Sequence, residues 1–159
     1  MARHAFFSFR YRADNSRAAR VRNSWLMKAD RQASGFFDKA KWEEVKRKND
    51  SAIKSWIDEQ LVGTSVTVVL IGSDTAGKKW IDYEIEASHN KGNGILGIYI
   101  HNMKDLSGNT MNKGANPFSS WNFTKNGVAV TYPTYSWVAD DGYNNMGSWI
   151  ETAATAAGR

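Results

Sequence analysis

The sequence predicts a three-layer α/β sandwich, in which helices cover both faces of a five-stranded parallel sheet. Short runs rich in β-branched and aromatic residues alternate along the chain with longer segments of helical periodicity, and this alternation is typical of parallel sheets. The two clearest runs, residues 4–9 and 66–71, are apolar on both faces. Strands of that kind lie buried between two helical layers.

Composition indicates one compact domain over residues 1–159. Hydrophobic residues make up 42% of the chain and aromatic residues 13%, enough for a substantial core at this length. The formal charge of +5 suits an anionic ligand, but Lys and Arg do not cluster, so we expect no nucleic-acid partner. The chain has no Cys, which excludes a thiol nucleophile and a Cys-ligated zinc site. No apolar run is long enough to span a membrane, and we expect a cytoplasmic protein.

The run at 66–71 is expected at the centre of the sheet, followed by a turn and a helix from about 78 to 91 that Gly92 ends. Before it we expect a strand at 4–9 and a helix capped by Asp14 or Asn15 that runs to about 28. A strand, or the loop after it, should follow at 34–38, then a helical turn at 42–48 and a helix at 50–61. After it we expect a strand at 95–100, an irregular insertion at about 102–131, an edge strand at 132–138 and a helix at 144–156.

Two further expectations concern individual side chains. Arg17 and Arg20 should lie on the outer, solvated face of the first helix. Trp121 belongs to the insertion, whose polar composition contrasts with its three aromatic residues. Because each aromatic side chain can bury a large area, we expect the insertion to be ordered and to bury Trp121.

Glu84 is the residue that departs most clearly from its surroundings. At about 100° per residue, it falls within the arc of its helix that also carries Trp80, Ile81 and Ile85, and this arc should face the sheet. A buried carboxylate is costly unless it is hydrogen-bonded or paired, and such residues occur at functional sites more often than chance predicts. The structural alternative is a Glu satisfied by an Arg or by backbone N–H groups.

The predicted topology brings further polar and aromatic residues close to Glu84. With five strands, the commonest order is the flavodoxin-like 2-1-3-4-5, whose ligands bind outside the carboxyl ends of strands 1 and 3. The helix of Glu84 begins just beyond the second of these ends. The candidate binding residues at the two ends are Phe9, Arg10, Tyr11, Ser73 and Asp74, with Trp80 on the helix itself.

The residues around this edge favour chemistry at a ribose carbon. The sequence has no P-loop and no GxGxxG motif, and its three His are scattered, so we expect neither a metal nor a bound cofactor. A single carboxylate is sufficient to cleave NAD⁺, because nicotinamide leaves as a neutral base and needs no general acid. Trp80 and Tyr11 would stack on flat bases, and Arg10 would pair with a pyrophosphate.

The motif Trp80-x-x-x-Glu84 resembles the signature of Toll/interleukin-1 receptor (TIR) domains that cleave NAD⁺. The opening Phe6-Phe7-Ser8-Phe9, the block from 68 to 101 and the segment 140–145 are similar to the TIR-like ThsB subunits of the Thoeris anti-phage defence system. The resemblance implies a TIR fold and Glu84 as the catalytic residue. It also implies a cyclic ADP-ribose isomer as product, which activates a separate effector protein.

The resemblance places Phe9, Arg10, Tyr11, Ser73, Asp74 and Trp80 around NAD⁺, which is the substrate and not a cofactor. It further implies that residues 36–38 correspond to the assembly loop of TIR domains, and that self-assembly or a phage-derived trigger controls activity. Two alternatives stay open. One is a non-catalytic TIR-like interaction module, and the other is an enzyme similar to nucleoside 2-deoxyribosyltransferases, which also use a glutamate on a related fold.

Overall fold

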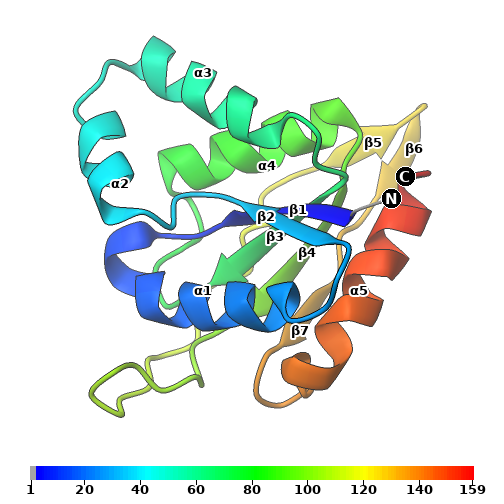
Figure 1. Cartoon of the computed structure of the whole chain (residues 1–159). Coiled ribbons are helices and arrows are strands. Elements are labelled where there is room, and N and C mark those ends of the chain that lie inside the picture. The colour runs from blue at the N-terminus through cyan, green and yellow to red at the C-terminus, as the bar shows by residue number, and fades with distance from the viewer. Residues whose placement is uncertain (1–2) are drawn as a thin grey trace.

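A five-stranded parallel sheet forms the centre of the computed structural model, which describes residues 3–159 (Figure 1). Its order is β2-β1-β3-β4-β7, and every neighbouring pair is parallel. The strands are β1 (Arg3–Ser8), β2 (Arg31–Ser34), β3 (Val66–Ile71), β4 (Gly94–Tyr99) and β7 (Thr134–Ser136). Because β7 is the fifth strand of this sheet along the chain, the predicted order 2-1-3-4-5 is confirmed.

Helices cover both faces of the sheet and complete the predicted three layers (Figure 1). On one face lie α1 (Tyr11–Leu26) and α5 (Gly142–Ala156); on the other lie α3 (Asp50–Leu61) and α4 (Lys79–Lys91), with the short α2 (Lys39–Val45) beside α3. Gly92 ends α4 in a left-handed conformation with φ 87°, as predicted. Within residues 3–159, no helix is both long and apolar enough to cross a membrane.

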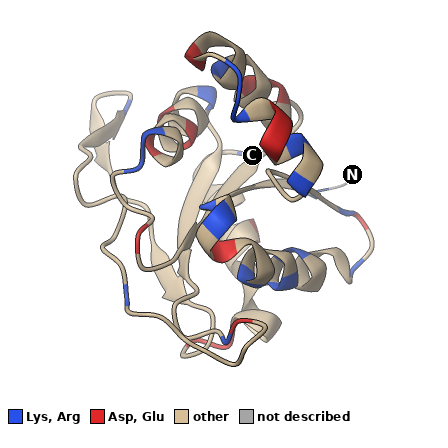
Figure 2. Cartoon of the chain, turned by 90° about the vertical axis from the view of Figure 1, so that its left-hand side faces the viewer, with Lys and Arg blue, Asp and Glu red and all other residues tan. Residues whose placement is uncertain are grey.

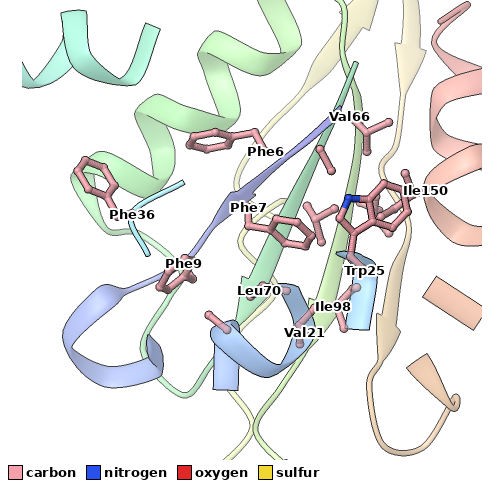
Figure 3. Packing of buried hydrophobic residues seen from close by; sticks show 14 of the residues in the cluster. Phe6, Phe7, Phe9, Val21, Trp25, Phe36, Val66, Leu70, Ile98 and Ile150 are labelled. Carbon is pink, nitrogen blue, oxygen red and sulfur yellow. The ribbon is translucent and has the colours of Figure 1, made fainter. Parts of the chain in front are cut away.

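The central strand β3 is buried along its whole length, and the largest core cluster lies on the α1 and α5 side of it. Figure 3 shows Phe7 and Leu70 packed near Trp25 and Ile150, while Phe6 points to the opposite side, toward α4. Alternate residues of β1 therefore serve the two layers. This alternation places Ser8, two residues after Phe6, on the α4 side of the sheet.

The predicted start of α1 is wrong. The helix begins at Tyr11 and its N-cap is Arg10, four residues before Asp14, so Asp14 is not a cap but a buried residue of the first turn, 1% exposed. Gly72 makes room for it, because a Cβ at Gly72 would come within 2.6 Å of both Asp14 carboxylate oxygens. Arg17 was expected on the solvated face and is also buried, since its guanidinium donates to the backbone oxygens of Met103 and Asn109.

Those two carbonyls belong to the insertion, which packs against the domain over two regions. The first follows β4 and reaches the loop after β3, where Gly114 lies against the backbone oxygen of Gly72. The second contains an antiparallel hairpin, β5 (Phe123–Lys125) and β6 (Val128–Val130), which the sequence interpretation missed. Phe118 and Phe123 are buried, and Trp121 is half-buried and stacks on Phe123 with ring centres 5.2 Å apart. The insertion is thus ordered, as expected, but the expected burial of Trp121 is only partial.

Candidate active site

A cavity of about 220 Å³ opens where β1 ends, beside the first turns of α4. It lies between two segments that are far apart in the sequence, because parallel pairing of β1 with β3 brings their carboxyl ends to one edge. Its walls consist of Phe9, Arg10, Tyr11, Arg12, Phe36, Trp42, Lys78, Lys79, Trp80, Ile81 and Glu84. Of the seven predicted site residues, the structure therefore brings five together around this cavity.

Glu84 reaches the cavity from the second turn of α4. Its side chain is 3% exposed, and Glu84 Oε1 accepts a hydrogen bond from Ser8 Oγ at 3.1 Å. Ser8 is itself completely buried at the end of β1. Among residues 3–159 no cationic side chain forms an ion pair with Glu84, so the structural alternative of an Arg partner does not apply. A serine hydroxyl holds this carboxyl instead.

The electrostatic environment of Glu84 keeps it protonated in this structure. Burial removes water from the carboxylate and raises the pKa of Glu84 from 4.5 to about 8, while the hydrogen bond from Ser8 opposes the rise. With that pKa, roughly one molecule in ten carries the negative charge at pH 7. A carboxyl whose charge depends so strongly on its surroundings is typical of a functional site.

The aromatic wall of the cavity comes from α1, α2 and α4 and from the segments that follow β1 and β2. Tyr11, at the start of α1, lies with its ring centre 5.6 Å from that of Trp42, and Phe36 meets Trp42 edge-to-face at 4.9 Å. Phe9 contributes the end of β1, and Trp80 faces the cavity from α4. Phe36 and Trp42 escaped the sequence interpretation, which assigned them to an assembly loop and a helical turn. Their aromatic character was a signal, but only the fold of 35–45 shows which way they face.

Charged residues line the cavity where α1 and α4 begin. Figure 2 shows how Lys, Arg, Asp and Glu are distributed along the ribbon on this side of the molecule. Arg10 Nη1 lies 2.6 Å from Asp74 Oδ2, and Lys78 Nζ lies 3.2 Å from the same oxygen. The hydrogen bond from Lys78, with further help from Arg10, lowers the pKa of the exposed Asp74 carboxyl. Two cations therefore converge on one carboxylate oxygen, a geometry in which an anionic ligand would compete with Asp74.

Ser73 and Asp74, the other two predicted site residues, are not among the described residues that line the cavity. Asp74 lies at its rim through the contact with Arg10. Ser73 is exposed, and its backbone N–H faces Met111 Sδ at 3.1 Å, on the side of the insertion. Their expected roles in substrate binding stay predictions.

A larger cavity, of about 420 Å³, lies at the opposite end of the sheet. The end of α4, the β5–β6 hairpin and the end of α5 enclose it, and its wall is mostly apolar. His89 joins two of these elements by contacts with the Tyr132 hydroxyl and with the backbone oxygen of Thr124. Glu84 is not part of it, so the smaller cavity is the candidate active site on chemical grounds.

Comparison with known proteins places the chain in a family. Residues 6–105 match the family model described as Thoeris protein ThsB, TIR-like domain. A relative in Bacillus cereus (strain MSX-D12), named "Putative cyclic ADP-D-ribose synthase ThsB1", is 36% identical over 191 aligned residues, which cover 94% of this chain and 100% of the relative.

The chain belongs to the ThsB family of TIR-like proteins.

The match to the family model contains the whole of the candidate site. It runs from β1 to the segment after β4 and so includes Ser8, the aromatic wall, both rim cations and Glu84. The hairpin β5–β6, the edge strand β7 and α5 lie beyond it. The relative, in contrast, aligns along 94% of the chain, so its similarity extends beyond the residues that the family model matches.

Proposed function

We propose that the protein is a TIR-like enzyme that cleaves NAD⁺ between nicotinamide and ribose and forms a cyclic ADP-ribose-type nucleotide. The observation that carries the proposal is Glu84, a lone buried carboxyl at the wall of an aromatic cavity with cations at its mouth. The name of the B. cereus relative supports the product class. We further propose that the nucleotide activates a separate defence effector in the cytoplasm, and that NAD⁺ is consumed without another cofactor.

The size of the cavity suggests how NAD⁺ would lie. A volume of about 220 Å³ is below the range of about 300–1,000 Å³ typical of sites that enclose a whole small molecule. Nicotinamide and its ribose would fill it, stacked against Trp80 and Tyr11. The pyrophosphate would then pass over the rim, where Arg10 and Lys78 exchange Asp74 for phosphate oxygens.

In the proposed reaction the bond between the ribose C1′ and the nicotinamide nitrogen breaks, and its electron pair leaves with the neutral base. The ribose carries the positive charge, and the Glu84 carboxylate stabilises it across the cavity. An atom of the adenosine half then attacks C1′ and closes the ring, whereas attack by water would give linear ADP-ribose. If the attacking atom is a hydroxyl oxygen, its proton passes to Glu84.

The substrate itself supplies the charge that ionises Glu84. The pyridinium ring of NAD⁺ brings a positive charge next to a carboxyl that is mostly protonated without it. At about 4 Å and an effective dielectric constant of about 20, the attraction is worth roughly 4 kcal/mol, which lowers a pKa by about three units. A pKa of about 8 then falls well below 7, and the reactive carboxylate forms with substrate in place.

The test is release of nicotinamide from NAD⁺ by the purified protein, alone and with extract from phage-infected cells. Mass spectrometry distinguishes the products, because the cyclic nucleotide is lighter than ADP-ribose by one water. Nicotinamide release with a cyclic product supports the proposal. Binding of partners without turnover of NAD⁺ in either condition would instead support the non-catalytic interaction module, and base exchange on a deoxynucleoside would support the deoxyribosyltransferase-like enzyme.

A further inference from the structure

Glu84 depends on one neighbour for its orientation. In the described part of the chain, Ser8 Oγ is the hydrogen-bond partner of the Glu84 carboxyl, at 3.1 Å from Oε1. The two residues lie 76 positions apart in the sequence and meet because α4 covers the face of the sheet to which Ser8 points. Both side chains are buried, at 0% and 3% exposure, so water does not substitute readily for either of them.

Serine is an unusual residue at this place in the fold. Ser8 contacts Glu84 and so lies on the α4 side of β1, in a strand where Phe6 and Phe7 are core residues. A buried hydroxyl requires a partner, and the short side chain of serine keeps its Oγ close to the backbone of the strand. Beyond Cβ the side chain of Ser8 has a single heavy atom, Oγ, and its strand is held between β2 and β3. Ser8 is therefore a more rigid donor than a residue on a loop.

We propose that Ser8 is a positioning residue for the reaction assigned to Glu84: its hydroxyl holds Oε1 and so leaves Oε2 directed at the ribose. This inference rests on the proposed function. Donation to the carboxylate also favours the ionised form over the protonated one. Ser8 thus has two effects on the same group, since it fixes the orientation of the carboxyl and makes its negative charge easier to form.

A matched control lies one turn further along α4. Ser88 Oγ and Thr67 Oγ1 form a buried hydroxyl pair at 2.7 Å between α4 and β3, on the same side of the sheet as Ser8 and Glu84. Ser88→Ala removes one buried hydroxyl from the same interface as Ser8→Ala, but leaves the contact between Ser8 and Glu84 in place. A general loosening of α4 on the sheet would therefore affect both variants alike.

The other charged and titratable groups around Glu84 are the same in both variants. They line the cavity from the start of α1 and the start of α4, and they are Arg10, Tyr11, Arg12, Lys78 and Lys79. The walls from the 35–38 loop and α2 contribute Phe36 and Trp42, which carry no charge. A change confined to Ser8→Ala in the pH dependence of turnover thus reports on the hydroxyl and not on these neighbours.

The experiment measures kcat and KM for nicotinamide release between pH 5 and 9 for the parent, Ser8→Ala and Ser88→Ala, together with thermal unfolding. For Ser8→Ala we expect kcat at pH 7 to fall about tenfold to a hundredfold, KM to change little, and the midpoint of the kcat–pH profile to move to higher pH. For Ser88→Ala we expect lower thermal stability with the profile of the parent.

An active parent and a Ser8→Ala variant with the same kcat and the same midpoint would overturn the role of Ser8 and leave the proposed function standing. An equal shift in Ser88→Ala would also overturn it, because the effect would then belong to the packing of α4. A parent that releases no nicotinamide, with or without infected-cell extract, would overturn the proposed function and the role of Ser8 with it.

Discussion

Replacing Glu84 with Gln should separate the chemistry of this side chain from its structural role. Gln is nearly isosteric and keeps the carbonyl oxygen that accepts from Ser8 Oγ. It removes the negative charge on which stabilisation of the ribose cation depends. A loss of that kind costs enzymes about 100- to 1,000-fold in turnover, so we expect nicotinamide release to fall by at least that factor.

The same substitution should stabilise the fold at neutral pH, and the magnitude follows from the burial of the carboxyl. Burial raises the pKa of folded Glu84 from 4.5 to about 8, so between these values the folded state holds a proton that the unfolded state has lost. Stability then falls as pH rises through this window, by about 1.4 kcal/mol per pH unit. At pH 7 the deficit is at most about 3.5 kcal/mol, equivalent to roughly 7–14 °C in Tm for a chain of this size.

The assay compares thermal unfolding at pH 4 and pH 7 for the parent, Glu84→Gln and the control Glu86→Gln, whose side chain is exposed on the same helix. Glu84→Gln should gain Tm relative to the parent at pH 7 and differ little at pH 4, and Glu86→Gln should follow the parent in Tm and in turnover. A Glu84→Gln variant that loses Tm at pH 7 would show that Glu84 is a structural anion. A folded variant that cleaves NAD⁺ at the parent rate would refute the catalytic role.

Three further substitutions test the surroundings of Glu84. Asp14 is buried, its Oδ1 has no partner within residues 3–159, and burial raises its pKa from 3.8 to about 6. Asp14→Asn should therefore raise Tm at pH 7 by the equivalent of up to about 3 kcal/mol and leave Tm unchanged at pH 3.5. Asp74→Asn should free Arg10 and Lys78 for phosphate and lower KM for NAD⁺ about two- to fivefold, an effect that weakens at high salt. Trp42→Ala should raise KM about tenfold with kcat retained, because Trp42 packs against Tyr11, on which the base is proposed to stack; the measurement is steady-state kinetics well below the Tm of the variant.

The sequence was sufficient to predict the sheet and the position of Glu84, because both follow from local periodicity. Strand β3 is buried at every position and apolar at all but Thr67, a pattern typical of a strand covered on both faces. Glu84 is a charged residue on the otherwise apolar face of α4, and a helical wheel of the sequence is sufficient to place it there. The hairpin β5–β6 also had a local signal, Asn126-Gly127, whose positive φ angles of 54° and 78° are those of a tight hairpin turn.

The rest of the site depends on tertiary packing that no local pattern reveals. Phe36 and Trp42 reach the cavity only because the segment between β2 and α3 folds back beside Tyr11. Arg17 looked like a surface residue of an amphipathic helix, and it is buried because the insertion covers that part of α1. In both cases the deciding neighbour is distant in the sequence, so the side chain's surroundings could not be inferred from its own element.

Burial of Glu84 is consistent with catalysis because desolvation disfavours its carboxylate mainly while the site is empty. An apolar cavity disfavours the carboxylate while the substrate is absent, and the same low polarity strengthens its attraction to a cation once the pyridinium ring has entered. The desolvation that keeps Glu84 protonated in the empty site is thus offset only when a positively charged substrate is bound. A more exposed glutamate would stay ionised in either state, but water would screen the charge that the ribose cation needs. The single hydrogen bond from Ser8 then keeps the buried carboxyl in place for both states.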